Sequence, residues 1–194
     1  MTLTTDTVDH VFADAHTAYT FTTESVPDDA LRDIYESVKW APTAMNSQPL
    51  RISFVRSADA RSTLEPHVSP GNLVKVRSAP VTAILAYDRD WHEHLSALMP
   101  FATDPQLAWQ DRERRVDVAR LNAAIQAGYF ILAVRAHGLA AGPMGGFDRA
   151  GLDAAFFPDG RWRSLLLVNI GHPGPESFRP RMPRLDFEQA ATLL

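Results

Sequence analysis

A stretch of fourteen residues, Leu121 to Val134, is apolar except for Asn122, Gln126 and Gly128. It is too short to cross a membrane as a helix, which takes about 20 apolar residues. The surrounding pattern predicts one long helix from about Asp111 to His137, ended by Gly138 as its C′ residue. A helix that is apolar on every side needs contacts on every side. We therefore expect it to be buried, and a subunit interface could cover its outer face.

The composition is that of one ordinary globular domain. With 194 residues, of which 45% are hydrophobic and 22% charged, the chain can build a single core over residues 1–194. A formal net charge of −4 argues against nucleic acid as a partner. The absence of cysteine excludes disulfides, thiolate metal sites and cysteine nucleophiles. Residues 1–14 contain acidic side chains and no apolar core of a signal peptide, so we expect a cytoplasmic protein that does not enter a membrane.

Periodicity and turn residues predict a mixture of helices and strands. Short helices are expected over Val8–Ala18, from Pro27 to Ala41, and over Ala58–Leu64, His92–Met99, a few residues after Asp148, and Leu185–Leu194. Strands are expected over Arg51–Val55, Val81–Tyr87 and Ser164–Ile170. Residues 66–79 are expected to be mostly connection with a turn at Pro70-Gly71, and residues 142–148 a turn-rich segment that opens the helix after Asp148. The proline-rich residues 172–184 are expected to form an extended arm. Because no regular βαβ rhythm and no Gly-x-Gly-x-x-Gly motif occurs, the pattern favours α+β over a doubly wound fold.

The segment Trp40 to Pro49, Trp-Ala-Pro-Thr-Ala-Met-Asn-Ser-Gln-Pro, is expected to connect a helix to a strand. Its prolines stiffen the backbone, and its side chains carry donors and acceptors on short stems. Thr43, Asn46 and Gln48 could hydrogen-bond a planar heterocycle. They could equally be the capping residues of a rigid turn.

Two further segments are candidates for binding. Gly145 and Gly146 precede a predicted helix, so their backbone N–H groups could approach a ligand closely, although a plain helix-entry turn looks the same. Arg179 and Arg181 stand two apart in the extended arm, where both side chains could reach one phosphate. A solvated basic tail is the alternative for that pair.

Other signals are weaker. His92-Glu93-His94 has the composition of a metal site, but residues two apart on a helix diverge and no third ligand is evident, so we expect no metal. Residues 100–111 contain Phe101 and Trp109 without a clear period, and they form either a lid over a pocket or a mobile surface loop.

Read together, these segments are similar to those of the FMN-dependent nitroreductase family, in particular the branch that contains the malonic semialdehyde reductase of pyrimidine utilisation. The resemblance runs almost end to end, and several motifs occur in the family's order. They are Lys39-Trp40-Ala41-Pro42-Thr43 with Asn46, Gly71-Asn72-Leu73 with Lys75, Ala79-Pro80-Val81-Thr82-Ala83-Ile84, Gly142-Pro143-Met144-Gly145-Gly146-Phe147-Asp148-Arg149, and Pro183-Arg184-Leu185 before Phe187-Glu188.

The resemblance implies an α+β sandwich, with a central, mainly antiparallel sheet flanked by helices and an extended C-terminal arm. It also implies an intertwined homodimer with two FMN sites at its interface, where the long apolar helix is the dimer core and the arm embraces the partner. Thr43 and Asn46 would contact the flavin ring, supported by Gln48, and Asn72 and Lys75 would lie near the cofactor or the nicotinamide donor. Pro143, Met144, Gly145 and Gly146 would lie beside the ring, while Arg181 and Arg179 would bind the phosphate.

One position departs from the family pattern. Where the family usually has an early arginine that binds the phosphate, this chain has His16-Thr17, followed by Ala18 and Tyr19 in place of typical polar residues. A neutral imidazole binds phosphate less well than a guanidinium, so FMN affinity is expected to fall above neutral pH. The departure also leaves open that the cofactor has been lost.

The activity implied by the resemblance is ping-pong reduction of a small acceptor at the expense of NADH or NADPH. The acceptor would be a nitro compound, a quinone or an aldehyde such as malonic semialdehyde. Because the flavin carries the chemistry, no side chain is assigned as a catalytic acid or base. A flavin-binding carrier or sensor without turnover is the alternative, and a cofactor-free interaction module is a further one.

Overall fold

The computed structural model describes residues 4–194, except for the side chains of Asp6 and Thr7. Its centre is an antiparallel sheet of four strands in the order β1-β2-β4-β3. The strands are β1 Leu50–Val55, β2 Val81–Asp88, β3 Ala140–Met144 and β4 Trp162–Gly171. The α+β architecture and the mainly antiparallel sheet expected from the sequence are therefore confirmed.

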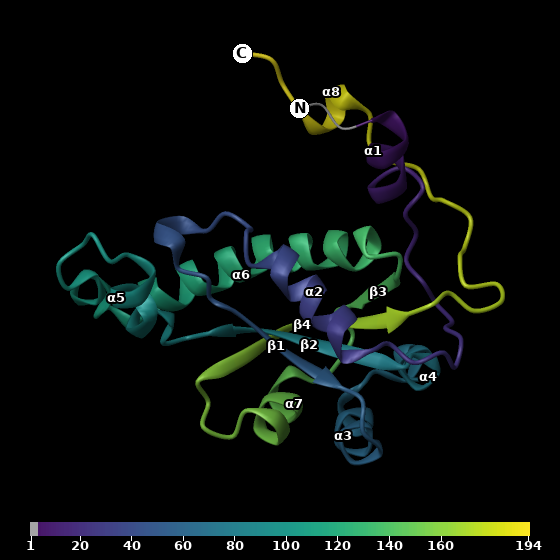
Figure 1. The fold of residues 1–194 in the computed structure, drawn as a ribbon, viewed down its shortest axis with the longest axis horizontal. Coiled ribbons are helices and arrows are strands. Elements are labelled where there is room, and N and C mark those ends of the chain that lie inside the picture. The colour runs from purple at the N-terminus through teal and green to yellow at the C-terminus, as the bar shows by residue number, and fades with distance from the viewer. Residues whose placement is uncertain (1–3) are drawn as a thin grey trace.

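Helices lie on both faces of this sheet (Figure 1). The α-helices are α1 Thr5–Val11, α2 Asp28–Val38, α3 Ala58–Leu64, α4 Pro70–Ser78, α5 Leu95–Leu98, α6 Arg112–Ala136, α7 Arg149–Phe156 and α8 Phe187–Ala190. Short 3₁₀ helices are η1 Ala44–Asn46, η2 Glu65–His67, η3 Trp91–His94 and η4 Pro105–Trp109. None of the described helices is long and apolar enough to cross a membrane.

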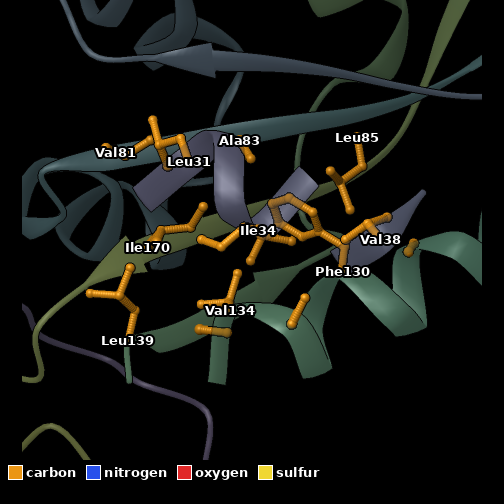
Figure 2. Packing of buried hydrophobic residues seen from close by; sticks show 14 of the residues in the cluster. Leu31, Ile34, Val38, Val81, Ala83, Leu85, Phe130, Val134, Leu139 and Ile170 are labelled. Atoms are coloured by element: carbon orange, nitrogen blue, oxygen red, sulfur yellow. The ribbon is translucent and has the colours of Figure 1, made fainter. Parts of the chain in front are cut away.

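The larger core fills the space between the sheet and the layer formed by α2 and α6 (Figure 2). Ile34 from α2 and Phe130 from α6 are completely buried there, against side chains of β2 and β4. The opposite face of the sheet packs against α3, α4 and α7 in a second core cluster. Strand β2 supplies both cores, Ala83 and Leu85 to the first and Ile84 to the second. Burial on both faces explains why β2 has a nearly continuous apolar sequence.

The long helix α6 begins and ends close to the predicted residues. The side chain of Asp111 accepts hydrogen bonds from two backbone N–H groups of the first turn, and Gly138 has a φ of +75° at the other end. One side of α6 faces the sheet, whereas Leu121, Ile125 and Tyr129, spaced by four residues, are 40–65% exposed. The helix is thus covered on one side only within a single chain.

The prediction for residues 66–79 was wrong, because residues Pro70–Ser78 form the helix α4. Pro70 was interpreted as part of a turn, yet it occupies the first turn of the helix, where a missing N–H costs nothing. The turn signal Pro70-Gly71 therefore marks a helix start. This matters for the site, since α4 carries Asn72 and Lys75.

Two other boundaries also differ from the prediction. The turn-rich segment expected over residues 142–148 begins within a strand, since Ala140–Met144 form β3, which tolerates Pro143 because β3 is an edge strand. The first helix ends at Val11 and not at Ala18. The chain is extended there because the N–H of Ala18 donates to the carbonyl of Ala141, at 3.0 Å.

Of the two aromatic residues in the loop after α5, Phe101 and Trp109, only one is exposed. Trp109 is only 6% exposed and packs against Trp91, with 4.9 Å between the ring centroids. Phe101 is 85% exposed. Trp109 thus belongs to the core, and only Phe101 is placed to contact another molecule.

Candidate cofactor site

The loop after α2 holds its backbone in an unusual conformation. Met45, Asn46 and Gln48 all have positive φ, between 40° and 54°, which is rare for residues other than glycine. Such strain persists only where surrounding contacts enforce it, and it is concentrated at binding sites. The backbone N–H of Ala44 donates to Oδ1 of Asn122 at 2.7 Å, which fixes the loop to α6.

The polar side chains of this loop form hydrogen bonds within the loop and to its neighbours. Nε2 of Gln48 donates to Oδ1 of Asn46 at 2.7 Å, and Nδ2 of Asn46 donates to the carbonyl of Leu98 at 3.1 Å. The hydroxyl of Thr43 accepts from the N–H of Gln48 at 3.2 Å. All three predicted residues line one shallow cavity together with Trp40 and Pro42. The structure therefore brings Thr43, Asn46 and Gln48 together.

The glycine pair lies at the end of β3, against the start of α4. The carbonyl of Gly146 accepts from the N–H of Ser69 at 3.2 Å and from Nδ2 of Asn72 at 3.1 Å. Nζ of Lys75 donates to Oδ1 of Asn72 at 3.0 Å. Gly145 is exposed, and a Cβ atom built on it would meet no atom within 4 Å. The predicted glycine and α4 residues therefore form one cluster with open space at Gly145.

Pro143 and Met144 precede this cluster on β3. The side chain of Met144 is buried in the second core cluster and Pro143 is partly buried. The side chain of Met144 is thus turned into the protein, and only its backbone could face a ligand.

The arginines of the arm line a cavity of about 440 Å³ near the N-terminal segment. Arg179, Arg181 and Arg184 contribute to it from the arm, and His16 and Thr17 from the segment after α1. Arg181 donates to the backbone carbonyls of Ala13 and Ala15, so the arm and the N-terminal segment lie side by side. The structure thus places His16 and Thr17 beside the predicted arginine pair.

Arg135, in the last turn of α6, also lines this cavity, and the sequence pattern did not single it out. Its pKa is lowered from the ordinary arginine value, first by burial and then by the nearby positive charge of Arg181. None of the described residues that line the cavity is acidic. A cavity that gathers four guanidinium groups and an imidazole in this way is suited to an anion.

Tyr19 connects the arginine cavity to the glycine cluster. Nζ of Lys75 lies 4.6 Å from the centroid of its ring, and Cζ of Arg179 lies 4.2 Å from it. These are cation–π distances. Asn72, Lys75, Gly146 and the arginines therefore belong to one continuous surface, and Tyr19 is a second residue that the sequence pattern missed.

The loop after α2 does not reach this surface within one chain. It is fixed to α6 at Asn122, whereas the arginine cavity is at Arg135. Thirteen residues separate the two along the helix, a distance of about 20 Å at 1.5 Å per residue. The predicted site residues thus form two groups at different places along α6.

The His92-Glu93-His94 sequence lies in η3, where Glu93 pairs with Arg161 at 2.8 Å and His94 lines a cavity together with Gln48. Within residues 4–194, no group of three histidine or acidic side chains is arranged to hold a metal ion.

Comparison with known proteins adds three findings. The model of the nitroreductase family matches residues 13–172. Proteins named "Putative NADH dehydrogenase/NAD(P)H nitroreductase" are 50% identical over 93% of this chain in Streptomyces coelicolor (90% of that protein) and 47% identical over 96% in Rhodopseudomonas palustris (95% of that protein). A crystal structure from Exiguobacterium sibiricum, described as a complex with FMN, superimposes with a TM-score of 0.87 at 20% identity, covering 100% of this chain and 99% of that one.

Proposed function

The chain belongs to the nitroreductase family, and we propose that it is an FMN-dependent oxidoreductase that uses NADH or NADPH to reduce a small organic acceptor. The observation that supports an FMN site in this chain is the cavity lined by arginines beside Tyr19. A cytoplasmic location suits a protein that draws on NADH or NADPH.

The residues present fit the phosphate of FMN. The cavity offers guanidinium groups from two different elements, α6 and the arm, and none of its described lining residues is a carboxylate that would compete for them. Nε of Arg135 is buried and has no hydrogen-bond partner among the described residues, which is costly unless a ligand satisfies it. Of the predicted residues, His16, Thr17, Arg179 and Arg181 line the cavity, and we assign the phosphate to them.

The remaining predicted residues fit the rest of the cofactor. Asn72, Lys75 and the exposed Gly145 continue the surface from the phosphate position, and Thr43, Asn46 and Gln48 offer polar groups for the edge of a planar ring. When bound, FMN supplies the hydride chemistry between the nicotinamide donor and the acceptor. The chain's own residues bind and orient the cofactor, and no side chain is assigned as an acid or a base.

We also propose that the site is completed by a second copy of the chain in a homodimer. The two groups of site residues are anchored about 20 Å apart along α6 in one chain and line separate cavities, which favours a site shared between two chains. The exposed stripe of Leu121, Ile125 and Tyr129 on α6 is an apolar surface of the kind that dimers cover. In this arrangement the loop of one protomer faces the arginine cavity of its partner.

The C-terminal arm supports the same proposal. It extends away from the sheet in Figure 1. Phe178 and Met182 of the arm, and Leu185 and Phe187 just after it, are 48–74% exposed. The outer edge of β1 is open, and beside it Leu31, Tyr35 and Phe54 line a cavity of about 670 Å³. We propose that the arm of the partner occupies this cavity, so that the two chains embrace each other.

The test begins with the purified protein and its flavin absorbance. A yellow protein that is bleached by NADH or NADPH without oxygen and recovers its colour on adding an acceptor is the expected result. Nitro compounds, quinones and aldehydes such as malonic semialdehyde are compared as acceptors. A yellow protein that neither donor bleaches would be a carrier or sensor. A colourless protein that cannot be reconstituted with FMN would falsify the proposal.

A further inference from the structure

Arg135 belongs to α6, whereas the other guanidinium groups of the cavity come from the arm. Resting on the proposed function, we infer that Arg135 is a direct ligand of the FMN phosphate, a role that neither its position in an apolar helix nor its neighbours in sequence indicates.

The lack of hydrogen-bond partners for Arg135 supports this inference. Its Nε atom is buried without a partner, and within residues 4–194 the guanidinium takes part in no ion pair or hydrogen bond. Other partly buried arginines in the chain are engaged. Arg51, for example, donates to Asp88 at 2.8 Å and to the carbonyl of Gln48 at 2.9 Å. Arg135 is therefore held in place by packing, with one buried donor that no described group of the chain satisfies.

The charges around Arg135 point to an anion. Arg181 and Arg184 from the arm and His16 from the N-terminal segment line the same cavity, and Asp14 lines the small cavity that adjoins it without pairing with Arg135. Burial and the repulsion from Arg181 both oppose the charge of Arg135. Bringing like charges together in this way is unfavourable until a phosphate joins them.

A purely structural role for Arg135 makes a different prediction. A cation in the last turn of a helix is stabilised by the helix dipole, and its stem can cover apolar surface. Such a role would support the whole pocket and would not distinguish ligands with and without a phosphate group. Riboflavin has the same ring and ribityl chain as FMN but no phosphate, so the two ligands separate the roles.

The experiment compares FMN and riboflavin binding to the apoprotein of full-length Arg135→Met, followed by quenching of flavin fluorescence. We expect FMN affinity to fall about ten- to a hundredfold, the loss of a charge-assisted contact, while riboflavin affinity stays at the wild-type value. Arg112→Met is the matched control, because Arg112 is an exposed arginine at the other end of the same helix. Its FMN affinity is expected to stay at the wild-type value.

Two results would overturn the inference. One is wild-type FMN affinity in Arg135→Met, and the other is an equal loss for FMN and riboflavin, which identifies a structural role. If Arg135→Met does not fold, as judged by its melting transition, Arg135→Lys replaces it, and its affinities for FMN and riboflavin are compared in the same way. Lysine keeps the charge but loses the planar fork. A wild-type apoprotein that binds neither flavin overturns the proposed function as well, so the two failures are distinguishable.

Discussion

The guanidinium of Arg179 lies over the ring of Tyr19, with 4.2 Å between its Cζ atom and the ring centroid. Nζ of Lys75 lies 4.6 Å from the same centroid. The ring of Tyr19 thus contacts both Arg179 of the arm and Lys75 of α4. The proposed phosphate site includes that junction, and the N–H of Tyr19 adds to it by donating to the carbonyl of Ser177 in the arm, at 2.9 Å.

Replacing the Tyr19 ring tests the junction. Tyr19→Leu is expected to weaken FMN binding about 3- to 30-fold, because cation–π contacts contribute about 0.5–2 kcal/mol. Tyr19→Phe keeps the aromatic face and is expected to bind FMN nearly as well as the wild type. The measurement is a fluorescence titration of each apoprotein. Unchanged affinity in Tyr19→Leu would show that the ring does not position the arm.

The two glycines at the end of β3 are expected to respond differently to a methyl group. A Cβ atom on Gly146 would lie 2.7 Å from Nδ2 of Asn72, whereas one on Gly145 meets open space. Gly146→Ala should therefore lower the free energy of unfolding by about 1 kcal/mol, because the Asn72 side chain must turn away and lose its hydrogen bond to the carbonyl of Gly146. Gly145→Ala should leave it within about 0.5 kcal/mol of the wild-type value.

Gly145→Ala is also expected to change FMN affinity. Because Gly145 is proposed to lie beside the ring, Gly145→Ala should weaken FMN binding without loss of stability. Urea unfolding of the apoprotein and an FMN titration give the two readouts. Wild-type binding by Gly145→Ala would place the flavin ring elsewhere.

Mixing two defective chains tests whether one site draws on two protomers. One chain carries Thr43→Ala and Asn46→Ala, and the other carries Arg181→Ala. If the loop of one protomer faces the arginines of its partner, each mixed dimer contains one intact site and one doubly defective site. After unfolding and refolding in equal amounts, about a quarter of all sites should bind FMN normally, for random pairing.

The controls are the two variants refolded separately, which should show no normal sites. Failure of the mixture to exceed them, with mixed dimers demonstrated by differently tagged chains, would contradict the proposed dimer.

The carboxylate of Asp88 is expected to be important for stability. It is 1% exposed and accepts from Arg51 at 2.8 Å and from Arg161 at 3.0 Å. Asp88→Ala removes the buried carboxylate that the two guanidinium groups share and should cost about 2–4 kcal/mol. The cost is towards the lower value because Arg51 keeps the carbonyl of Gln48 and Arg161 keeps Glu93 as acceptors. Equilibrium urea unfolding gives the value, and a loss no larger than that of a surface pair would contradict it.

A matched control for Asp88 is Glu65→Ala. The Glu65 carboxylate pairs with Arg77 at the surface, and this contact lowers the pKa of Glu65. Surface pairs contribute little, so Glu65→Ala should unfold at nearly the wild-type urea concentration.

His16 provides a substitution test of the phosphate site. A guanidinium offers a planar fork of donors that matches a phosphate, whereas an imidazole does not. His16→Arg is therefore expected to bind FMN more tightly than the wild type. FMN titrations of the two apoproteins at one pH check this statement. Equal or weaker binding by His16→Arg would rule out a contribution from position 16.

Much of the fold could be predicted from local sequence. The helix at 112–136 is marked by an acidic N-cap and a glycine at C′, and β2 by an apolar run buried on both faces. These signals lie within a few residues of the element that they specify. The errors arose where proline and glycine marked regular structure, at Pro70 in the first turn of α4 and at Pro143 in an edge strand. Only the position of a strand in the sheet decides whether a proline is tolerated there.

For the site, local sequence identifies the residue types of three separate segments, and their order indicates the family. Local sequence does not say which segments meet. The folded chain shows that α4 supports the glycine pair through Asn72, that Tyr19 contacts both Lys75 and the arm, and that Arg135 lines the arginine cavity. It also separated the loop after α2 from that cavity. The physical reason is that a helix fixes distances along its axis, so residues anchored at Asn122 and at Arg135 stay about 20 Å apart whatever their chemistry.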